Sequence, residues 1–165
     1  MALTKLNNQS LAAVTSAGIP IRSGTVLQVV SETSAATVNT SSASFVTTGL
    51  TATITPSSSS SKILILFNAS MFNNLNASNA IATVFRGTVS GTNLGEAAFG
   101  FGSCYGDSAL VKNKVAGSYL DSPSTTSATT NTVGMKTSGA TSGDISSYFN
   151  VGAEKSVLTL MEIAG

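Results

Sequence analysis

GLTATITPSSSSSKILILF, residues 49–67, decides the fold that we expect of this chain. An alternating segment ends at Pro56, a run of serines fills 57–61, and the longest uninterrupted apolar run of the protein follows at 63–67. That run is too short for a membrane span or a full-length helix, so it predicts a strand. Both of its faces are apolar. We therefore expect one face to pack on the chain's own core and the other on a second layer or a neighbouring subunit.

The serines at 57–61 separate two strand-like segments, and we interpret them as a loop between strands that share an edge; a flexible linker between domains is the alternative. Further strands are expected wherever β-branched or alternating residues are bounded by Gly, Pro, Asn or Ser. These segments are 25–31, 45–55, 80–86, 109–115, 117–121, 129–137, 144–151 and 157–163, with 32–44 either an edge strand or an exposed loop. About eight to ten short strands with no competing helical pattern predict an all-β fold of two antiparallel sheets packed face to face.

Within this sandwich, the apolar residues of the strands should form the core. The expected core residues are Val26, Ile54, Ile63, Ile65, Phe67, Leu158 and Leu160. A bulge is expected at Gly49, and glycines at 87, 91 and 95 favour a hairpin.

The N-terminus carries apolar residues at loosely helical spacing, namely Leu3, Leu6, Leu11 and Val14. A frayed terminus is one interpretation. We prefer an arm that becomes ordered on a partner, because regular leucines have no use in a disordered tail. The chain then divides into an N-terminal anchoring arm at 1–23 and a β-sandwich at 24–165, and the four apolar arm residues are the predicted partner-binding site.

The composition is unusually neutral, with 9% charged residues against roughly 25% in a typical soluble domain. A net charge of +1 with scattered basic residues gives no positive face for nucleic acid. The N-terminal segment lacks the apolar core of a signal peptide, and no segment is long enough to span a bilayer. A single cysteine, Cys104, excludes an internal disulfide and fits synthesis in a reducing cytoplasm.

No residue pattern in the sequence indicates a reaction. The absence of histidine removes the common general base and the histidine zinc sites, and the seven acidic residues are dispersed without paired or calcium-loop spacing. We interpret each acid as a solubilising residue at a turn or strand end. Cys104 is interpreted as a buried, inert thiol rather than a nucleophile. We expect no enzyme activity, no metal site and no cofactor.

Five segments resemble a family of small β-rich virion proteins of tailed phages, particularly those of marine and cyanobacterial hosts. They are MALTKLNNQSLAAVTSAGIP (1–20), GTVLQVV (24–30), TTGLTATITPSSSSSKILILFN (47–68), SYLDSPSTTSATTNTV (118–133) and LTLMEIAG (158–165). The resemblance implies a virion structural protein with a jelly-roll-like sandwich, similar to capsid decoration proteins and to trimeric heads. At Asn131 the family pattern has an aromatic residue.

Two functions follow from this resemblance. The first is a capsid decoration or cement protein, a head fibre or knob on the particle surface, made in the host cytoplasm and bound to the major capsid protein or another virion protein. The absence of a repetitive shaft favours it. The second is a tail fibre protein or receptor-binding tip, with loops such as 73–79 or 103–107 contacting a host-surface glycan. A small hydrolase using Cys104 or Asp107 is the weakest reading. A homotrimer is expected, with a lone copy at a capsomer centre as the alternative.

Overall fold

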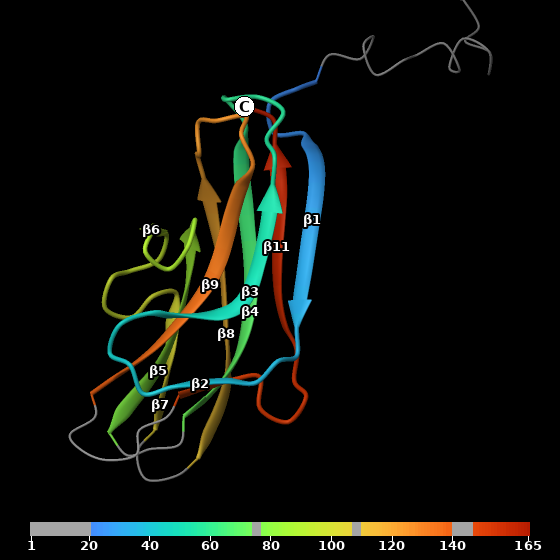
Figure 1. The fold of residues 1–165 in the computed structure, drawn as a ribbon. Helices are drawn as coiled ribbons and strands as arrows, with labels where there is room; N and C mark the ends of the chain where they lie inside the picture. Colours follow the sequence, from blue (N-terminus) through green and yellow to red (C-terminus); the bar gives the residue numbers. More distant parts are fainter. Residues whose placement is uncertain (1–20, 74–76, 107–109, 140–146) are drawn as a thin grey trace, which may run out of the picture.

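The computed structural model describes residues 21–73, 77–106, 110–139 and 147–165. All the helix and strand elements assigned in these ranges are β-strands, so the described part of the chain is all β (Figure 1). The strands are β1 (Val26–Ser34), β2 (Val38–Thr40), β3 (Val46–Ile54), β4 (Lys62–Asn73), β5 (Ser78–Arg86), β6 (Thr92–Asn93), β7 (Gly102–Gly106), β8 (Val111–Asp121), β9 (Thr129–Ser138), β10 (Ser147–Phe149) and β11 (Ser156–Ile163).

The long strands pair in a nested order along the chain. Strand β5 pairs with β7, β4 with β8, β3 with β9 and β1 with β11, all antiparallel. The chain therefore folds like one long hairpin that is wound into two layers, which is the topology of a jelly roll. The predicted antiparallel, jelly-roll-like β-sandwich is confirmed.

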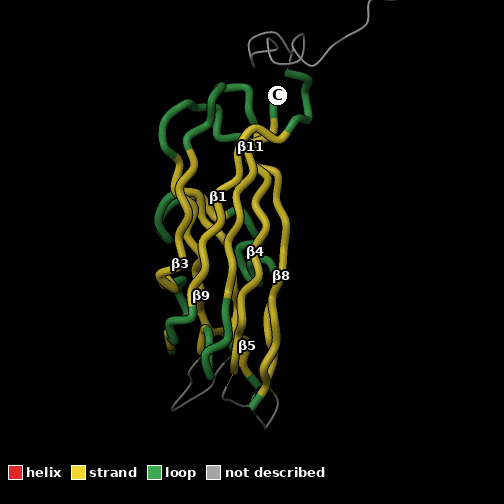
Figure 2. The backbone as a smooth tube through the Cα atoms, turned by 90° about the vertical axis from the view of Figure 1, so that its right-hand side faces the viewer, coloured by secondary structure: helices red, strands yellow, loops and turns green. Residues whose placement is uncertain are grey.

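The two layers are sheets of different composition. Sheet A contains β1, β11, β4 and β8 in that lateral order, with β10 and β2 extending it beside the second half of β4. Sheet B contains β3, β9 and β5, with β6 and β7 pairing along the far edge of β5. The strands run along the long axis of the molecule, and Figure 2 shows the same layers in a second view.

Strand β4 lies at the centre of sheet A and alternates as its sequence predicts. Ile63, Ile65 and Phe67 are at most 4% exposed and face the core. Leu64 is half-buried and Leu66 is 37% exposed on the outer face. The core also receives Ile54 from β3 and Leu158 and Leu160 from β11, in agreement with the prediction.

Val26 is the one predicted core residue that the structure places elsewhere, and it is 50% exposed. Val26 pairs with Ile163, whereas Gln28 pairs with Glu162, so a bulge lies between Val26 and Gln28. An extra residue in one strand reverses which face the side chains before it occupy. The bulge therefore turns Val26 to the outer face, and the prediction that it is a core residue was wrong.

The serine loop also behaves differently from the prediction. Strands β3 and β4 belong to different sheets, so residues 57–61 cross from one layer to the other and do not join paired strands. The segments expected at 109–115 and 117–121 meet in one continuous strand, β8, which begins at Val111; residue 109 lies outside the described residues. Other local predictions are confirmed: Gly49 has φ 79° within the register shift of β3, and β5 and β6 form an antiparallel hairpin.

Candidate functional site

Glu162, on β11, points into the sandwich and is fully buried. One carboxylate oxygen accepts hydrogen bonds from the backbone N and the Oγ of Ser57, both at 2.7 Å, and the other accepts one from Gln28 Nε2 at 2.6 Å. Burial by itself raises the pKa of Glu162, but the hydrogen bonds from Ser57 and Gln28 outweigh it and lower the pKa to about 2. This carboxylate fastens the serine loop and β1 to β11.

Asp121 and Arg86 form a link between the two sheets. Arg86 ends β5 in sheet B and Asp121 ends β8 in sheet A, and the guanidinium donates from Nε at 2.8 Å and from Nη2 at 2.5 Å. The Asp121 side chain is 2% exposed and that of Arg86 is 34% exposed. This hydrogen bonding raises the pKa of Arg86. The interpretation of all acids as solubilising surface residues was therefore wrong for Asp121 and Glu162.

Cys104 is buried on β7, as predicted, and its Sγ lies 3.5 Å from the carbonyl oxygen of Val111. Burial raises the pKa of its thiol, which keeps it in the unreactive protonated form. In the described ranges, no three cysteine or acidic side chains gather closely enough to hold a metal ion. The contacts of Glu162, Asp121 and Cys104 therefore act within the fold, where they join strands of the sandwich.

The predicted partner-binding residues Leu3, Leu6, Leu11 and Val14 lie outside the described residues. The described chain begins at Ile21, which is 64% exposed. Gly24 N donates to Ala164 O, and Ala164 N donates to Thr25 O, both at 2.8 Å. These bonds fix the start of the described chain beside the end of β11, at the end of the molecule that carries the C-terminus (Figure 1).

The outer face of sheet A carries a group of exposed apolar side chains. One cross-strand row joins Val29, Met161, Leu64 and Leu120, because Val29 pairs with Met161, Met161 with Leu64, and Leu64 with Leu120. Val29 is 53% exposed and Leu120 is 48% exposed. This row is the surface that the doubly apolar 63–67 run predicts, although the sequence indicated only the β4 part of it.

A shallow hollow of about 460 Å³ lies beside this row on the same face. Leu66 lies in it between small neighbours, because Ser118 of β8 and Thr159 of β11 are its cross-strand partners. Ala116 and Val157 line it further along the strands. The outer face of sheet A therefore combines a row of large apolar side chains with an adjoining depression.

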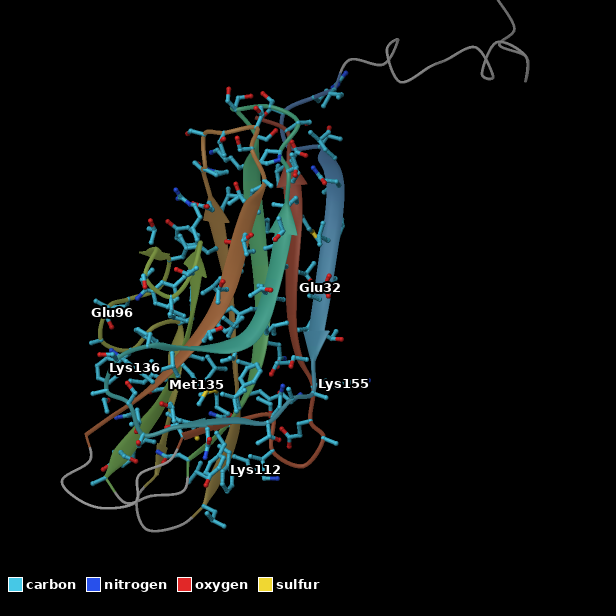
Figure 3. All side chains as sticks on the ribbon, in the orientation of Figure 1. Glu32, Glu96, Lys112, Met135, Lys136 and Lys155 are labelled. Atoms are coloured by element: carbon cyan, nitrogen blue, oxygen red, sulfur yellow. The ribbon has the colours of Figure 1, made fainter. Side chains whose placement is uncertain are left out.

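A second surface lies on the outer face of sheet B, where Figure 3 shows Glu96 and Lys136 close together. Lys136 Nζ lies 4.5 Å from the centroid of the Phe45 ring and 3.0 Å from the carbonyl oxygen of Ala97. Hydrogen bonds from the backbone N–H groups of Ala98 and Phe99 lower the pKa of Glu96. These contacts hold the 94–101 segment on the sheet.

The loops predicted to contact a glycan, 73–79 and 103–107, are partly strand where the structure describes them. Residues 74–76 and Asp107 lie outside the described residues. Residues 103–106 belong to β7, where Cys104 and Gly106 are buried and Tyr105 is 53% exposed. Asn73, at the end of β4, is buried and donates from Nδ2 to the carbonyl oxygens of Ser78, at 2.7 Å, and Cys104, at 3.2 Å. It therefore ties the β4 and β5 ends together, which sequence reasoning did not foresee.

The part of the chain that the structure describes contains no helix long and apolar enough to cross a membrane.

Comparison with known proteins gives matches only at the level of structure. No family model matches the chain, and no curated protein has a matching sequence. A chain in the structure of infectious bursal disease virus Gx strain aligns at a TM-score of 0.51 with 18% identity, over 84% of this chain and 32% of that one. The infectious bursal disease virus VP2 subviral particle aligns at 0.47 with 15% identity, over 84% and 37%. The Gt strain aligns at 0.47 with 16% identity, over 87% and 39%.

This chain thus spans only about a third of the length of the viral chains that it matches. At such low identity, the likeness concerns the path of the backbone. The conclusion that it carries is one of fold: the chain is an antiparallel, jelly-roll-like β-sandwich of the kind found in a virus particle.

Proposed function

We propose that this chain is a structural protein on the surface of a bacteriophage particle, most simply a capsid decoration or cement protein. The observation that carries the proposal is the nested jelly roll, whose backbone path is shared with a chain of infectious bursal disease virus. The sequence resemblance to virion proteins of tailed phages supports the same assignment and adds the phage context.

The arm at residues 1–23 is the proposed attachment to the major capsid protein or another virion protein. Burying its leucines would contribute about 1.5–3 kcal/mol each if they are fully covered. Such contacts stabilise the shell because a ligand that binds only the assembled state shifts the equilibrium toward it. Few charges take part, so attachment should change little with ionic strength. The chain would be made in the host cytoplasm and would act as a homo-oligomer, a trimer by analogy with the family.

Immunogold labelling of intact virions with antibody against the purified chain tests the location. Label on the head is expected. Label confined to the tail would replace the decoration role with a tail fibre role, and virions that carry no label would refute both.

The attachment is tested with full-length chains that are added to particles lacking the protein. Substituting Leu3→Ser together with Leu6→Ser should weaken binding at least tenfold, because two buried apolar contacts are lost. The matched control is Asn7→Ser with Asn8→Ser, which changes the same arm without removing apolar area and should leave occupancy unchanged. Equal occupancy for both pairs would contradict the anchoring role.

One observation favours the alternative of a receptor-binding tip. Tyr105 exposes 53% of its surface on β7, which lies at the opposite end of the molecule from the start of β1 (Figure 1). An exposed aromatic ring is the group on which sugars stack in many binding sites. If Tyr105→Ala abolishes adsorption to host cells while particle occupancy is unchanged, the tip function is supported over the decoration function.

A further inference from the structure

The outer face of sheet A carries four successive cross-strand rows that differ in size and polarity. The first joins Val26, Ile163 and Lys62, and the second is the large apolar row of Val29, Met161, Leu64 and Leu120. The third joins Ser31, Thr159, Leu66 and Ser118, and the fourth joins Thr33, Val157, Asn68 and Ala116. The Ser31 and Thr159 hydroxyls lie 2.8 Å apart, which places both side chains on this face.

The second row and the hollow lie side by side, so the face has a ridge of large side chains next to a depression that such a ridge could fill. The row presents Leu64 and Leu120, whereas the third and fourth rows form the hollow around Leu66 with small or short side chains. Adjacent rows on one strand are about 6.7 Å apart. A copy turned by half a revolution and laid face to face would place its large row over the hollow, and its own hollow would receive the row of the first copy.

The charges on this face are placed so that they do not oppose such a contact. Among the described residues of these four rows, Lys62 is the one charged side chain. The lysines of β8, Lys112 and Lys114, pair with Phe72 and Ser70 in the other half of the sheet, and Figure 3 shows Lys112 toward that end. A nearly neutral face carries no field that would select an oppositely charged partner, and two copies of it do not repel each other.

The size of the face fits a weak, reversible contact. Strands β1, β11, β4 and β8 lie side by side along β4 residues 62–68, the part of the sheet that carries the four rows. Seven residues and four strands about 4.8 Å apart make a face of roughly 23 Å by 19 Å, or about 440 Å². Two copies would therefore bury about 880 Å² together, which is the size of a transient interface.

We infer that the outer face of sheet A, formed by β1, β11, β4 and β8, is the contact between two copies of this chain, with the Val29–Met161–Leu64–Leu120 row of each copy packed in the Leu66 hollow of the other. This two-fold contact makes a dimer, in place of the trimer that the family analogy suggests. This inference goes beyond the virion role, because self-association is measured in solution without any particle. It also gives the apolar outer side of β4 the cover that its sequence requires.

Sedimentation velocity of the full chain tests the contact across a range of about 1–100 μM, since association follows mass action. The unaltered chain should shift from monomer toward dimer as its concentration rises through this range. Val29→Glu and Leu120→Glu, at two exposed positions of the row, should each weaken association at least tenfold. The matched control is Tyr105→Glu, at an equally exposed position on β7 of the other sheet, and it should associate like the unaltered chain. A melting curve by circular dichroism verifies that each variant is folded.

A chain that is monomeric throughout this range overturns the inference. Val29→Glu and Leu120→Glu variants that associate normally overturn it as well, since the contact would then lie elsewhere. Loss of association on deleting residues 1–20, with both row variants unaffected, would assign the contact to the arm instead.

A chemical readout keeps the inference testable if a charged variant fails to fold. Ser118→Cys introduces a thiol at an exposed position in the hollow, while Cys104 is buried. The new thiol should react at least tenfold more slowly in concentrated than in dilute samples, because the row of the neighbouring copy covers it. Equal rates at both concentrations would contradict the contact.

Discussion

Replacement of Glu162 by glutamine should remove much of the acid sensitivity of this fold. The carboxylate is buried and accepts three hydrogen bonds, two from Ser57 and one from Gln28. Glutamine keeps an oxygen for Ser57 but presents an amide N–H group to the Gln28 amide, so that bond is lost together with the charge. The substitution therefore acts on the interaction that lowers the pKa of Glu162.

The magnitude follows from the pKa change. A drop from 4.5 to about 2 corresponds to about 3 kcal/mol of stability at neutral pH. Because the pKa is lower in the folded chain, this contribution is complete above pH 4.5 and is lost as the pH falls through 2. Glu162→Gln should thus lower the free energy of unfolding by about 2–3 kcal/mol at pH 7, or the melting temperature by about 4–12 °C. At pH 2 and below, the two proteins should be nearly equal.

Urea unfolding followed by circular dichroism from pH 7 to pH 2 measures this difference directly. Glu32→Gln is the matched control, because Glu32 lies exposed on β1 and its neutralisation should change stability by less than about 0.5 kcal/mol. Parallel curves for the unaltered chain and Glu162→Gln over the whole range would refute the reasoning, since the buried carboxylate would then contribute no pH-dependent stability.

Three further predictions concern buried polar groups. Asp121→Ala should lower the free energy of unfolding by about 2 kcal/mol, which is less than the loss on breaking a fully buried ion pair, because Arg86 is 34% exposed. A coupling energy below about 0.5 kcal/mol in a double-mutant cycle with Arg86→Ala would contradict this. Asn131 is 1% exposed, and neither of its side-chain polar atoms has a hydrogen-bond partner among the described residues. Asn131→Leu should therefore raise the free energy of unfolding, measured in urea, by about 1–2 kcal/mol. A lower free energy of unfolding for this variant would refute the prediction. Cys104 should resist thiol reagents in the folded chain and react fully in urea; rapid labelling of the folded chain would show that its burial is incomplete.

The strands could be predicted from the sequence because their signals are local. The alternation in 45–55 and the apolar run at 63–67 correctly predicted the buried faces of β3 and β4, and Pro56 ends β3 as expected. The pairing of these strands could not be predicted in the same way. A loop of serines is compatible both with a hairpin and with a crossing between sheets, and the choice depends on β9 and β8, which pair with β3 and β4 from far along the chain.

The buried acids escaped prediction for a related reason. A lone carboxylate at a strand end usually lies in solvent, and the partners of Glu162 are 105 and 134 residues away in the sequence. The alternation of β11 did carry a usable signal, because Leu158, Leu160 and Glu162 share one face. That alternation predicts that the Glu162 carboxylate faces the core, whereas the residue type alone predicts that it faces solvent. For Val26, the bulge reversed the face that alternation assigns.

The contrast between the two outer faces argues that the apolar one is there to be covered. On β3, the outward residues after the bulge are Thr51 and Thr53, both exposed, and Thr53 shares a 2.8 Å hydroxyl contact with Thr130 of β9. On β4, which follows directly along the chain, the outward positions include Leu64 and Leu66. Threonine satisfies strand propensity as well as leucine or better, so sheet formation does not require the leucines. Their presence on the outer face of sheet A gives that side of the described sandwich an apolar surface, and the proposed contact between copies would cover it.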